Sequence, residues 1–276
     1  MHILGSGAVG PGKADWQILT GFHLKIIGIV LMVFDHIYQM FYMFGAPDWF
    51  TWLGRPVATI FLFLCAEGYH YTRSKAGYML SLFVGFQSMN VISTLLTLRM
   101  RLDDVALINN IFGTLLVSVF YMILADMLKQ AVSDKKLGAS LLVLSYMLLP
   151  FVVGILALTM TDLPVWLRVA VLRYIPNPIA VEGGFTLVLL GVLFHLFRKA
   201  RMIQVMIVLA VSALSLFLAD GVQWIMALAV IPILLYNGKR GPGGMCGKYF
   251  FYVFYPAHIY LLYVIAWLWS NQSALP

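Results

Sequence analysis

The stretch "LMVFDHIYQM", residues 31–40, decides the fold, because it places an aspartate and a histidine inside an apolar run that extends from Ile26 to Phe44. Insertion of an Asp at the centre of a lipid-embedded helix costs roughly 2.5 to 3.5 kcal/mol. Asp35 and His36 therefore need partners inside the protein, and other apolar segments of the chain must supply them.

The composition is that of a membrane protein. Of the 276 residues, 62% are hydrophobic and 11% are charged, and the mean hydropathy is +0.92. This composition excludes a soluble domain. The two cysteines, Cys65 and Cys246, are too few for a disulfide scaffold or a thiolate zinc site, so we expect no metal. Residues 1–17 lack the pattern of a cleavable signal peptide, and we expect them to form a short cytoplasmic segment.

Apolar runs separated by charges, glycines and prolines predict an all-α, polytopic transmembrane bundle of about nine spans, forming a single domain over residues 18–270. The predicted spans are 18–44, 50–71, 77–98, 105–128, 137–160, 182–197, 202–219, 222–236 and 248–269. Segment 162–178 combines tryptophan, arginine and tyrosine with apolar residues and ends in prolines. We therefore expect an outer, interfacial or re-entrant element there. Residues 271–276 would form an outer tail.

Lysine and arginine positions predict the orientation. With the N-terminus in the cytoplasm, four of the 18 Lys and Arg residues are outside (Arg99, Arg101, Arg168 and Arg173), Arg55 lies within a span and the rest are inside. The positive-inside rule thus predicts an N-in/C-out protein with an odd number of spans. The same rule accounts for the net charge of +7, so we expect a lipid bilayer, and no nucleic acid, as the partner.

Polar side chains of three spans fall at comparable depths. The first two spans are joined by a short loop, so Arg55, near the outer end of the second, can reach Asp35 and offset its cost. Adjacent helical residues point about 100° apart, so one of Asp35 and His36 can face Arg55 while the other faces a cavity. His258 lies near the middle of the last span, after Pro256.

Each of these residues also has a structural interpretation. Asp35 and Arg55 can form a buried ion pair without chemistry, and either histidine can be a packing residue, with His258 bound to a backbone carbonyl. Glu67 can pair with Arg73, and Asn109 or Asn110 can cap a helix. His195, Asp126 and Asp220 fit structural positions near span ends.

Segment 236–250 is glycine-rich and carries Lys239, Arg240 and Lys248. Exposed backbone N–H groups and cationic side chains of this kind can bind phosphate. The segment lacks the GK[ST] sequence of a P-loop, and a cytoplasmic loop is commonly basic for orientation alone.

Together, several stretches resemble the TraX family of bacterial integral-membrane proteins, whose named member is an F-pilin N-acetyltransferase. They are "LKIIGIVLMVFDHI" (24–37), "LGRPVATIFLFLCAEGYHYTRSKAGYM" (53–79), "NNIFGTLL" (109–116), "EGGFTLVLLGVLFHLFR" (182–198) and "LLYNGKRGPGGMCGKYFFYVFYPAHIYLLY" (234–263). The resemblance implies acetyl transfer from acetyl-CoA to an acceptor at the bacterial cytoplasmic (inner) membrane. The motif residues carried over by position are Asp35, His36, Arg55, Glu67, Arg73, Asn110 and His258. Gly113 departs from the family pattern, so Thr114 receives no role.

The residues and the resemblance together predict a multi-pass acetyltransferase with acetyl-CoA as donor and a protein N-terminus or a glycan as acceptor. We expect His36, His258, Asp35 and Arg55 to be catalytic, and Glu67, Asn110 and Tyr255 to bind substrate. The expected CoA-binding residues are Arg73, Lys75, Lys239, Arg240 and Lys248. A proton-coupled transporter or flippase is the alternative, because proton relays also use buried Asp, Glu and His. A non-catalytic membrane assembly factor is a further one.

Overall fold

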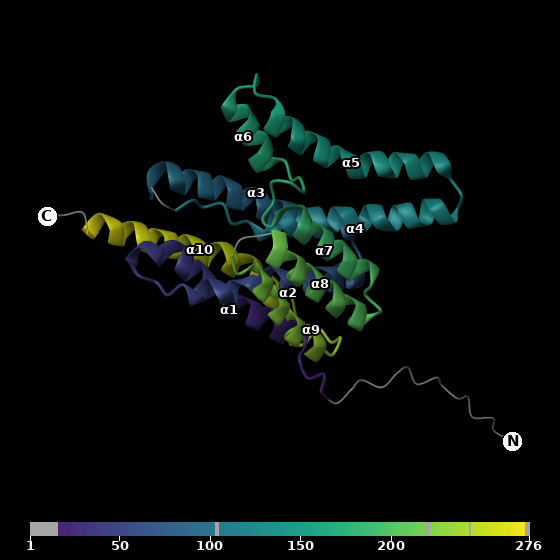
Figure 1. The fold of residues 1–276 in the computed structure, drawn as a ribbon, viewed down its shortest axis with the longest axis horizontal. Helices are drawn as coiled ribbons and strands as arrows, with labels where there is room; N and C mark the ends of the chain where they lie inside the picture. Colours follow the sequence, from purple (N-terminus) through teal and green to yellow (C-terminus); the bar gives the residue numbers. More distant parts are fainter. Residues whose placement is uncertain (1–15, 103–104, 219–220, 243, 274–276) are drawn as a thin grey trace.

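The computed structural model describes residues 16–102, 105–218, 221–242 and 244–273, without the side chains of residues 218, 244–248 and 272–273. The regular structure of the described residues consists of helices, apart from an isolated bridge between Leu19 and Tyr236. Its helices, drawn in Figure 1, are α1 (Gly21–Phe41), η1 (Tyr42–Phe44), α2 (Trp49–Tyr71), α3 (Lys75–Arg99), α4 (Ile111–Ser133), α5 (Leu137–Thr159), α6 (Val165–Tyr174), α7 (Gly184–Leu196), α8 (Arg201–Leu218), η2 (Gln223–Ala229), α9 (Val230–Leu235) and α10 (Gly244–Ser273).

Six of these helices are long and apolar enough to cross a membrane: α1 continued by η1, α2, α3, α4, α5 and α10. The predicted all-α membrane bundle is therefore confirmed. Three other predicted spans correspond to the shorter α7, α8 and η2–α9. At 1.5 Å per residue, α7 is about 20 Å long, against about 30 Å of hydrocarbon in a bilayer. The predicted number of nine spans is not confirmed.

Helix α10 runs parallel to α1. Near the start of both helices, the rings of Phe22 and Phe251 lie 6.2 Å apart, and near their ends Phe44 and Trp269 lie 6.1 Å apart. After α5, the chain must therefore return to the level at which α1 began before α10 can start. The short elements α7, α8 and η2–α9 make this return, and α1 and α10 end on the same side of the molecule (Figure 1).

Small residues allow the closest helix contacts. A Cβ atom at Gly54 of α2 would lie 2.2 Å from Cγ of Asp35 on α1. A Cβ atom at Gly191 of α7 would lie 3.0 Å from a methyl group of Leu62 and 2.9 Å from Oγ of Ser118. Small residues at crossings are typical of membrane helix packing, because backbones can then approach closely. The first contact also places the Asp35 carboxylate against the backbone of α2.

Helices α5 and α6 lie at the edge of the bundle (Figure 1). Most large apolar side chains of α5 are exposed, among them Leu141, Leu148 and Ile155, as expected for a helix that contacts lipid. Segment 162–178, for which the sequence predicts an interfacial or re-entrant element, contains the ten-residue helix α6.

Segment 236–241 is fastened to the start of α1. The backbone N–H of Gly21 donates to the Lys239 carbonyl at 2.8 Å, and that of Phe22 donates to the Arg240 carbonyl at 3.0 Å. The N–H of Asn237 donates in turn to the carbonyl of Leu19 at 2.8 Å. The backbone of this segment therefore holds the first turn of α1 in place.

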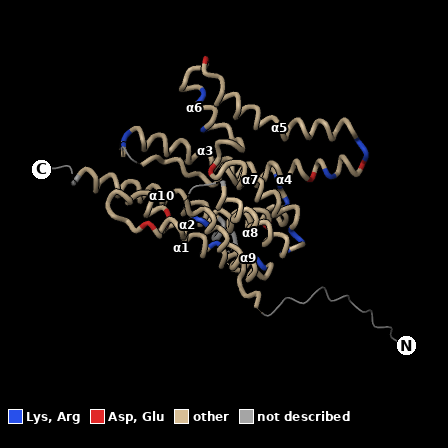
Figure 2. The backbone as a smooth tube through the Cα atoms, in the orientation of Figure 1, with Lys and Arg blue, Asp and Glu red and all other residues tan. Residues whose placement is uncertain are grey.

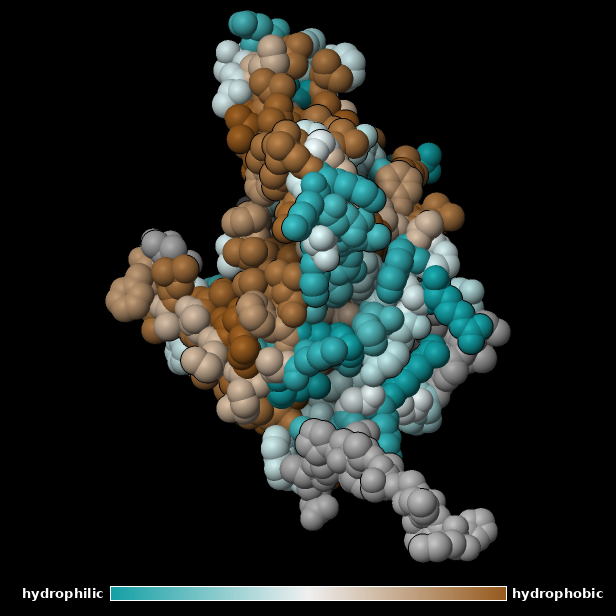
Figure 3. Space-filling view, turned by 90° about the vertical axis from the view of Figure 1, so that its right-hand side faces the viewer, coloured by the Kyte–Doolittle hydropathy of each residue, from teal (hydrophilic) through white to brown (hydrophobic). Residues whose placement is uncertain are grey.

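Lysine and arginine gather at the end of the molecule formed by the α2–α3, α4–α5 and α7–α8 turns and segment 236–241, here named the basic end. Figure 2 shows them around the α4–α5 turn and near the ends of α7, α8 and α9. Seen from that side, hydrophilic residues form a broad patch bordered by hydrophobic ones (Figure 3). The basic end thus corresponds to the side of the protein that the sequence predicts to be cytoplasmic.

Candidate functional site

Two imidazole rings meet between α1 and α10. Nδ1 of His36 lies 2.7 Å from Nε2 of His258, and both residues are buried. The short distance between the two ring nitrogens places His36 and His258 at the same depth in the bundle. The structure thus brings together two residues that are far apart in the sequence.

The hydrogen bonds assign a tautomer to each ring. Nδ1 of His258 lies 2.8 Å from the Phe254 carbonyl oxygen, which can only accept. In a neutral His258, Nδ1 therefore carries the hydrogen and Nε2 accepts. The hydrogen shared by the two rings then belongs to Nδ1 of His36. The pair consequently presents one basic nitrogen, Nε2 of His36.

Tyr255 connects the histidines to the start of α4. Its ring centroid lies 6.2 Å from that of His36 and 5.9 Å from that of His258. Its hydroxyl accepts the backbone N–H of Ile111 at 3.0 Å. Tyr255, which was predicted to bind substrate, thereby occupies one of the free N–H groups of the first turn of α4 and keeps its own hydroxyl hydrogen to donate.

Asn110 precedes α4 and is buried. Its amide Nδ2 donates to the Phe86 carbonyl at 3.0 Å and to Oδ1 of Asn90 at 3.1 Å. Its side chain makes no capping bond to α4, so the capping interpretation is wrong for this residue. Oδ1 of Asn110 is buried and has no hydrogen-bond partner in the described chain. Leaving such an acceptor unpaired costs about 1–3 kcal/mol, which a ligand N–H or O–H group would recover.

Glu182 is the site residue that the sequence reasoning missed. Its Oε2 accepts the backbone N–H of Asn110 at 2.8 Å, and its own carbonyl accepts the hydroxyl hydrogen of Thr114 at 2.6 Å. Glu182 is also electrostatically coupled to Asp35 and Arg55. A carboxylate at the first position of a predicted span was the signal that could have identified it.

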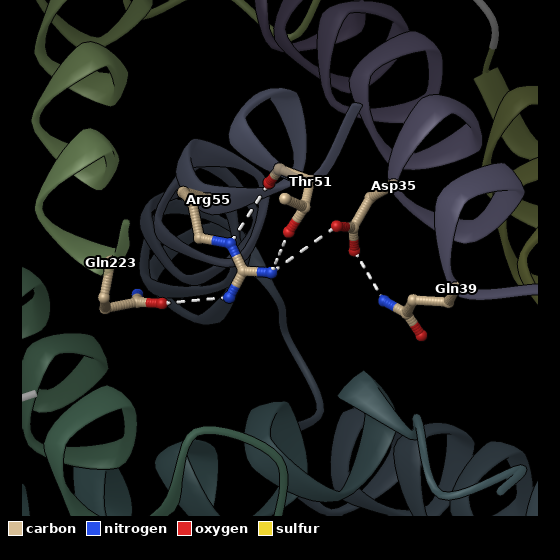
Figure 4. Close-up of polar contacts among 5 residues, drawn as sticks. All are labelled: Asp35, Gln39, Thr51, Arg55 and Gln223. Carbon is tan, nitrogen blue, oxygen red and sulfur yellow. Dashed lines mark hydrogen bonds and ion pairs between the residues drawn. The ribbon is translucent and has the colours of Figure 1, made fainter. Parts of the chain in front are cut away.

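Asp35 of α1 and Arg55 of α2 form a partly buried ion pair (Figure 4). Nη2 of Arg55 lies 3.6 Å from Oδ1 of Asp35, and Gln39 donates to Oδ2 of Asp35 at 2.7 Å. Arg55 also donates to the carbonyl and hydroxyl of Thr51 at 3.1 and 2.6 Å, and to Oε1 of Gln223 at 3.3 Å. The predicted approach of the two charges is present, and α2 and η2 together hold the guanidinium group.

A cavity of about 410 Å³ lies beside Gln39, on the side of the ion pair away from the basic end. Its lining residues come from α1, η1 and the α3–α4 connection: Tyr38, Gln39, Tyr42, Val105, Ala106, Ile108 and Asn109. Gln39 both lines the cavity and holds Asp35. The cavity therefore gives space for a polar molecule next to the ion pair.

Glu67 lies elsewhere, nearer the basic end. The groups that act on its carboxylate are the guanidinium groups of Arg201 and Arg198 and the hydroxyl of Tyr236. Arg73, the pairing partner that the sequence suggests, is not among these groups. Glu67 is therefore not gathered with Asn110 and Tyr255, with which it was predicted to bind substrate.

The predicted CoA-binding residues fall into two groups. Arg73 and Lys75 lie at the α2–α3 turn, where the Lys75 ammonium donates to the Tyr69 carbonyl and lies 3.9 Å from the centroid of its ring. Lys239 and Arg240 lie on the segment fastened to α1. The prediction of a loop as far as residue 250 is wrong, because α10 begins at Gly244. The side chain of Lys248 lies outside the described residues.

A comparison with protein families shows that these residues lie within one family match. A family model described as TraX protein matches residues 20–266. Nothing among the curated proteins and nothing among the solved structures matches the chain. The matched range contains the two histidines, the ion pair, Asn110 and Glu182.

Proposed function

The chain belongs to the TraX family of membrane proteins, and we propose that it is a membrane-bound acetyltransferase. It moves an acetyl group from acetyl-CoA to the amine or hydroxyl of an acceptor, either a pilin N-terminus or a cell-surface glycan. The observation that carries the proposal is the buried pair of His36 and His258, whose hydrogen bonds leave a basic nitrogen on His36. An imidazole oriented in this way can act as a general base or as an acyl acceptor.

In direct transfer, the acceptor nitrogen or oxygen attacks the thioester carbonyl carbon. Nε2 of His36 takes the proton of that N–H or O–H group during the attack. The new bond to the acetyl carbon forms, the carbon–sulfur bond breaks, and the CoA thiolate receives the proton that His36 holds. The products are the acetylated acceptor and CoA. General-base catalysis of this kind contributes on the order of 10²- to 10⁴-fold.

In a relayed transfer, Nε2 of His36 itself attacks the thioester. The carbon–sulfur bond breaks, CoA leaves as its thiolate, and an N-acetylimidazolium forms. The acceptor N–H or O–H then attacks the acetyl carbon, the bond from that carbon to Nε2 breaks and restores the neutral imidazole, and the proton lost by the acceptor neutralises the thiolate. Both routes put positive charge on the ring of His36. Its Nδ1–H donates to His258, so the bond between the rings becomes charge-assisted and stabilises that charge.

The surrounding polar groups could bind the acceptor and stabilise the developing oxyanion. Oδ1 of Asn110 can only accept, so it would bind the N–H or O–H of the acceptor rather than an oxyanion. Arg55 is the remaining candidate for oxyanion stabilisation. Asp35 balances the charge of Arg55, and the cavity beside Gln39 provides room for the acceptor.

The donor reaches this site from the basic end. Acetyl-CoA is an anion made in the cytoplasm, and the positive-inside rule places a basic end on that side. We therefore place the protein in the bacterial inner membrane, with the N-terminus inside and the end of α10 outside. The acetyl arm then extends from the basic end to the depth of His36.

The test uses the full chain in nanodiscs. Calorimetric titration with CoA and acetyl-CoA measures donor binding, and radiolabelled acetyl-CoA incubated with bacterial membrane extract measures transfer. Saturable binding, with transfer that is lost in a properly inserted His36→Ala variant, supports the proposal. Absence of binding, or transfer at the parent rate in that variant, refutes it. Proton-dependent solute uptake without an acetylated product would favour a transporter instead.

A further inference from the structure

A second cluster of polar side chains lies at the basic end, outside the proposed reaction site. The hydroxyl of Tyr69 donates to Oδ2 of Asp126 at 2.8 Å, and Nε2 of His195 lies 2.8 Å from Oδ1 of the same carboxylate. The rings of Tyr69 and His195 pack edge to face, with centroids 4.9 Å apart. The three residues come from α2, α4 and α7, so the cluster joins three helices near their inner ends.

His195 is held with one ring nitrogen open. A carboxylate only accepts, so Nε2 of His195 carries the hydrogen that it shares with Asp126. Nδ1 of His195 is buried and has no hydrogen-bond partner in the described chain. A histidine that served packing alone would have both nitrogens paired, because an unpaired buried polar atom costs about 1–3 kcal/mol. The open nitrogen therefore indicates a missing partner.

Cationic side chains lie near this cluster, because the Lys75 ammonium donates to the Tyr69 carbonyl and Arg198 and Lys199 follow His195 closely in the chain. Arg198, Lys75, His195 and Lys199 all act electrostatically on His70, so the α2–α3 and α7–α8 turns lie close together. The acidic groups that face them are Asp126, which His195 holds, and Glu67, on which Arg198 and Arg201 act. The cations at this corner outnumber the carboxylates. This excess of positive charge favours an anion as the ligand of the corner.

We propose that His195, Arg198 and Lys199 bind the phosphate groups of a nucleotide at this corner, with Lys75 alongside them. If the proposed acetyl transfer holds, this nucleotide is the phosphorylated adenosine end of the acyl donor. When His195 carries a hydrogen on both ring nitrogens, Nε2–H donates to Asp126 and Nδ1–H donates to a phosphate oxygen. Arg198 and Lys199 add charge at the rim.

The position of the cluster agrees with the reaction site. Tyr69 lies about 21 Å along α2 from Arg55 at 1.5 Å per residue. A nucleotide held at Tyr69 and His195 leaves this distance for the flexible arm of the donor to cover. Segment 236–241 is the competing location at the basic end, but the backbone N–H groups of Asn237 and Lys239 already donate, to the Leu19 carbonyl and to Oδ1 of Asn237.

The experiment measures CoA and 3′-phosphoadenosine 5′-phosphate binding to the full chain in neutral phosphatidylcholine nanodiscs. His195→Gln keeps an amide N–H for Asp126 and removes Nδ1, so the cluster is conserved. A second variant combines Arg198→Gln with Lys199→Gln. The matched control combines Lys135→Gln with Lys136→Gln, which removes two charges from the same end. Unfolding midpoints and gel filtration confirm that each variant is folded.

We expect each of the two test variants to weaken binding of both ligands by about tenfold or more, which corresponds to the loss of a charge-assisted hydrogen bond. The control should stay within about twofold, since exposed charges contribute little. Parent-like binding in both test variants would overturn the nucleotide site and leave the proposed function standing. If the parent protein does not bind CoA, the proposed acetyltransferase function is itself refuted.

Two further outcomes bear on the ligand. If Lys239→Gln combined with Arg240→Gln weakens binding while the His195 and Arg198 variants do not, the nucleotide binds at segment 236–241 and the inference is wrong. If phosphatidylglycerol nanodiscs abolish nucleotide binding, the corner binds a lipid headgroup, which also overturns the assignment. Equal nucleotide affinity in both kinds of nanodisc supports it.

Discussion

His36 donates from Nδ1 to Nε2 of His258 at 2.7 Å, and His258 donates from its own Nδ1 to the Phe254 carbonyl at 2.8 Å. This order of bonds makes the two histidines chemically different. His258 is anchored to its helix and orients its partner, whereas His36 offers the basic nitrogen. The proposed chemistry therefore assigns the reacting atom to His36 and a positioning role to His258.

Substitution of the two histidines should separate these roles. His36→Ala removes the base and should lower acetyl transfer by on the order of 10²- to 10⁴-fold. In His258→Gln, an amide oxygen can still accept from His36, so transfer should fall less than in His258→Leu, which offers no acceptor. The rates are measured with radiolabelled acetyl-CoA and membrane extract. Equal losses in His258→Gln and His258→Leu would contradict the positioning role.

Gly54→Ala tests the contact of α1 and α2 beside the ion pair. The added Cβ would lie 2.2 Å from Cγ of Asp35, so the carboxylate or the helices must move. We expect the free energy of unfolding to fall by about 1–3 kcal/mol, as for other overpacked sites. The matched control is Gly68→Ala on the same helix, where the nearest atom, the Tyr78 hydroxyl, is 3.5 Å away. Equal unfolding midpoints for the two variants would show that this contact is not tight.

The sequence was sufficient for relationships that depend on order and depth. A short loop predicts that α1 and α2 are neighbours, and hence that Arg55 reaches Asp35. Apolar runs predict the helices, and the lysines and arginines predict which turns share an end. These features follow from hydrophobicity and helical periodicity, which are local properties of the chain.

Contacts between side chains of helices that are far apart in the sequence could not be deduced from these local properties. Glu182 meets Asn110 only because α7 begins at the depth at which α4 begins. His195 and Asp126 were given structural roles because nothing in either segment predicts that α2, α4 and α7 meet. Hydropathy also does not distinguish a short helix that lies within the bundle from one that crosses the bilayer, so the predicted number of spans exceeds the number of long helices.

The energetic coupling of Asp35 and Arg55 can be measured with a double-mutant cycle. Asp35→Asn or Arg55→Gln each leaves one partly buried charge without its counterpart, and each should lower the free energy of unfolding by about 1–3 kcal/mol. The double variant leaves no unpaired charge, so its loss should be smaller than the sum of the two. Unfolding in nanodiscs, followed by tryptophan fluorescence, provides the values.

The exposed pair of Lys136 and Asp134, with 3.1 Å between Nζ and Oδ2, is the control cycle. Coupling there should be at most about 1 kcal/mol, because water screens the charges. Strictly additive losses at Asp35 and Arg55 would mean that the two side chains do not stabilise each other.

Cysteine accessibility tests the topology and the number of spans together. In a Cys246→Ser background, which keeps the buried Cys65, one added cysteine at a time replaces Lys136 at the α4–α5 turn, Asp162 before α6, or Asn271 near the end of α10. All three positions are exposed.

If α7, α8 and η2–α9 each cross the membrane, an impermeant maleimide should label Asp162→Cys and Asn271→Cys in intact cells. Lys136→Cys should react only after permeabilisation. If only the six long helices cross, Asn271→Cys should be protected along with Lys136→Cys. The parallel arrangement of α1 and α10 favours the first pattern, and labelling of Lys136→Cys in intact cells would place the basic end outside, away from the donor.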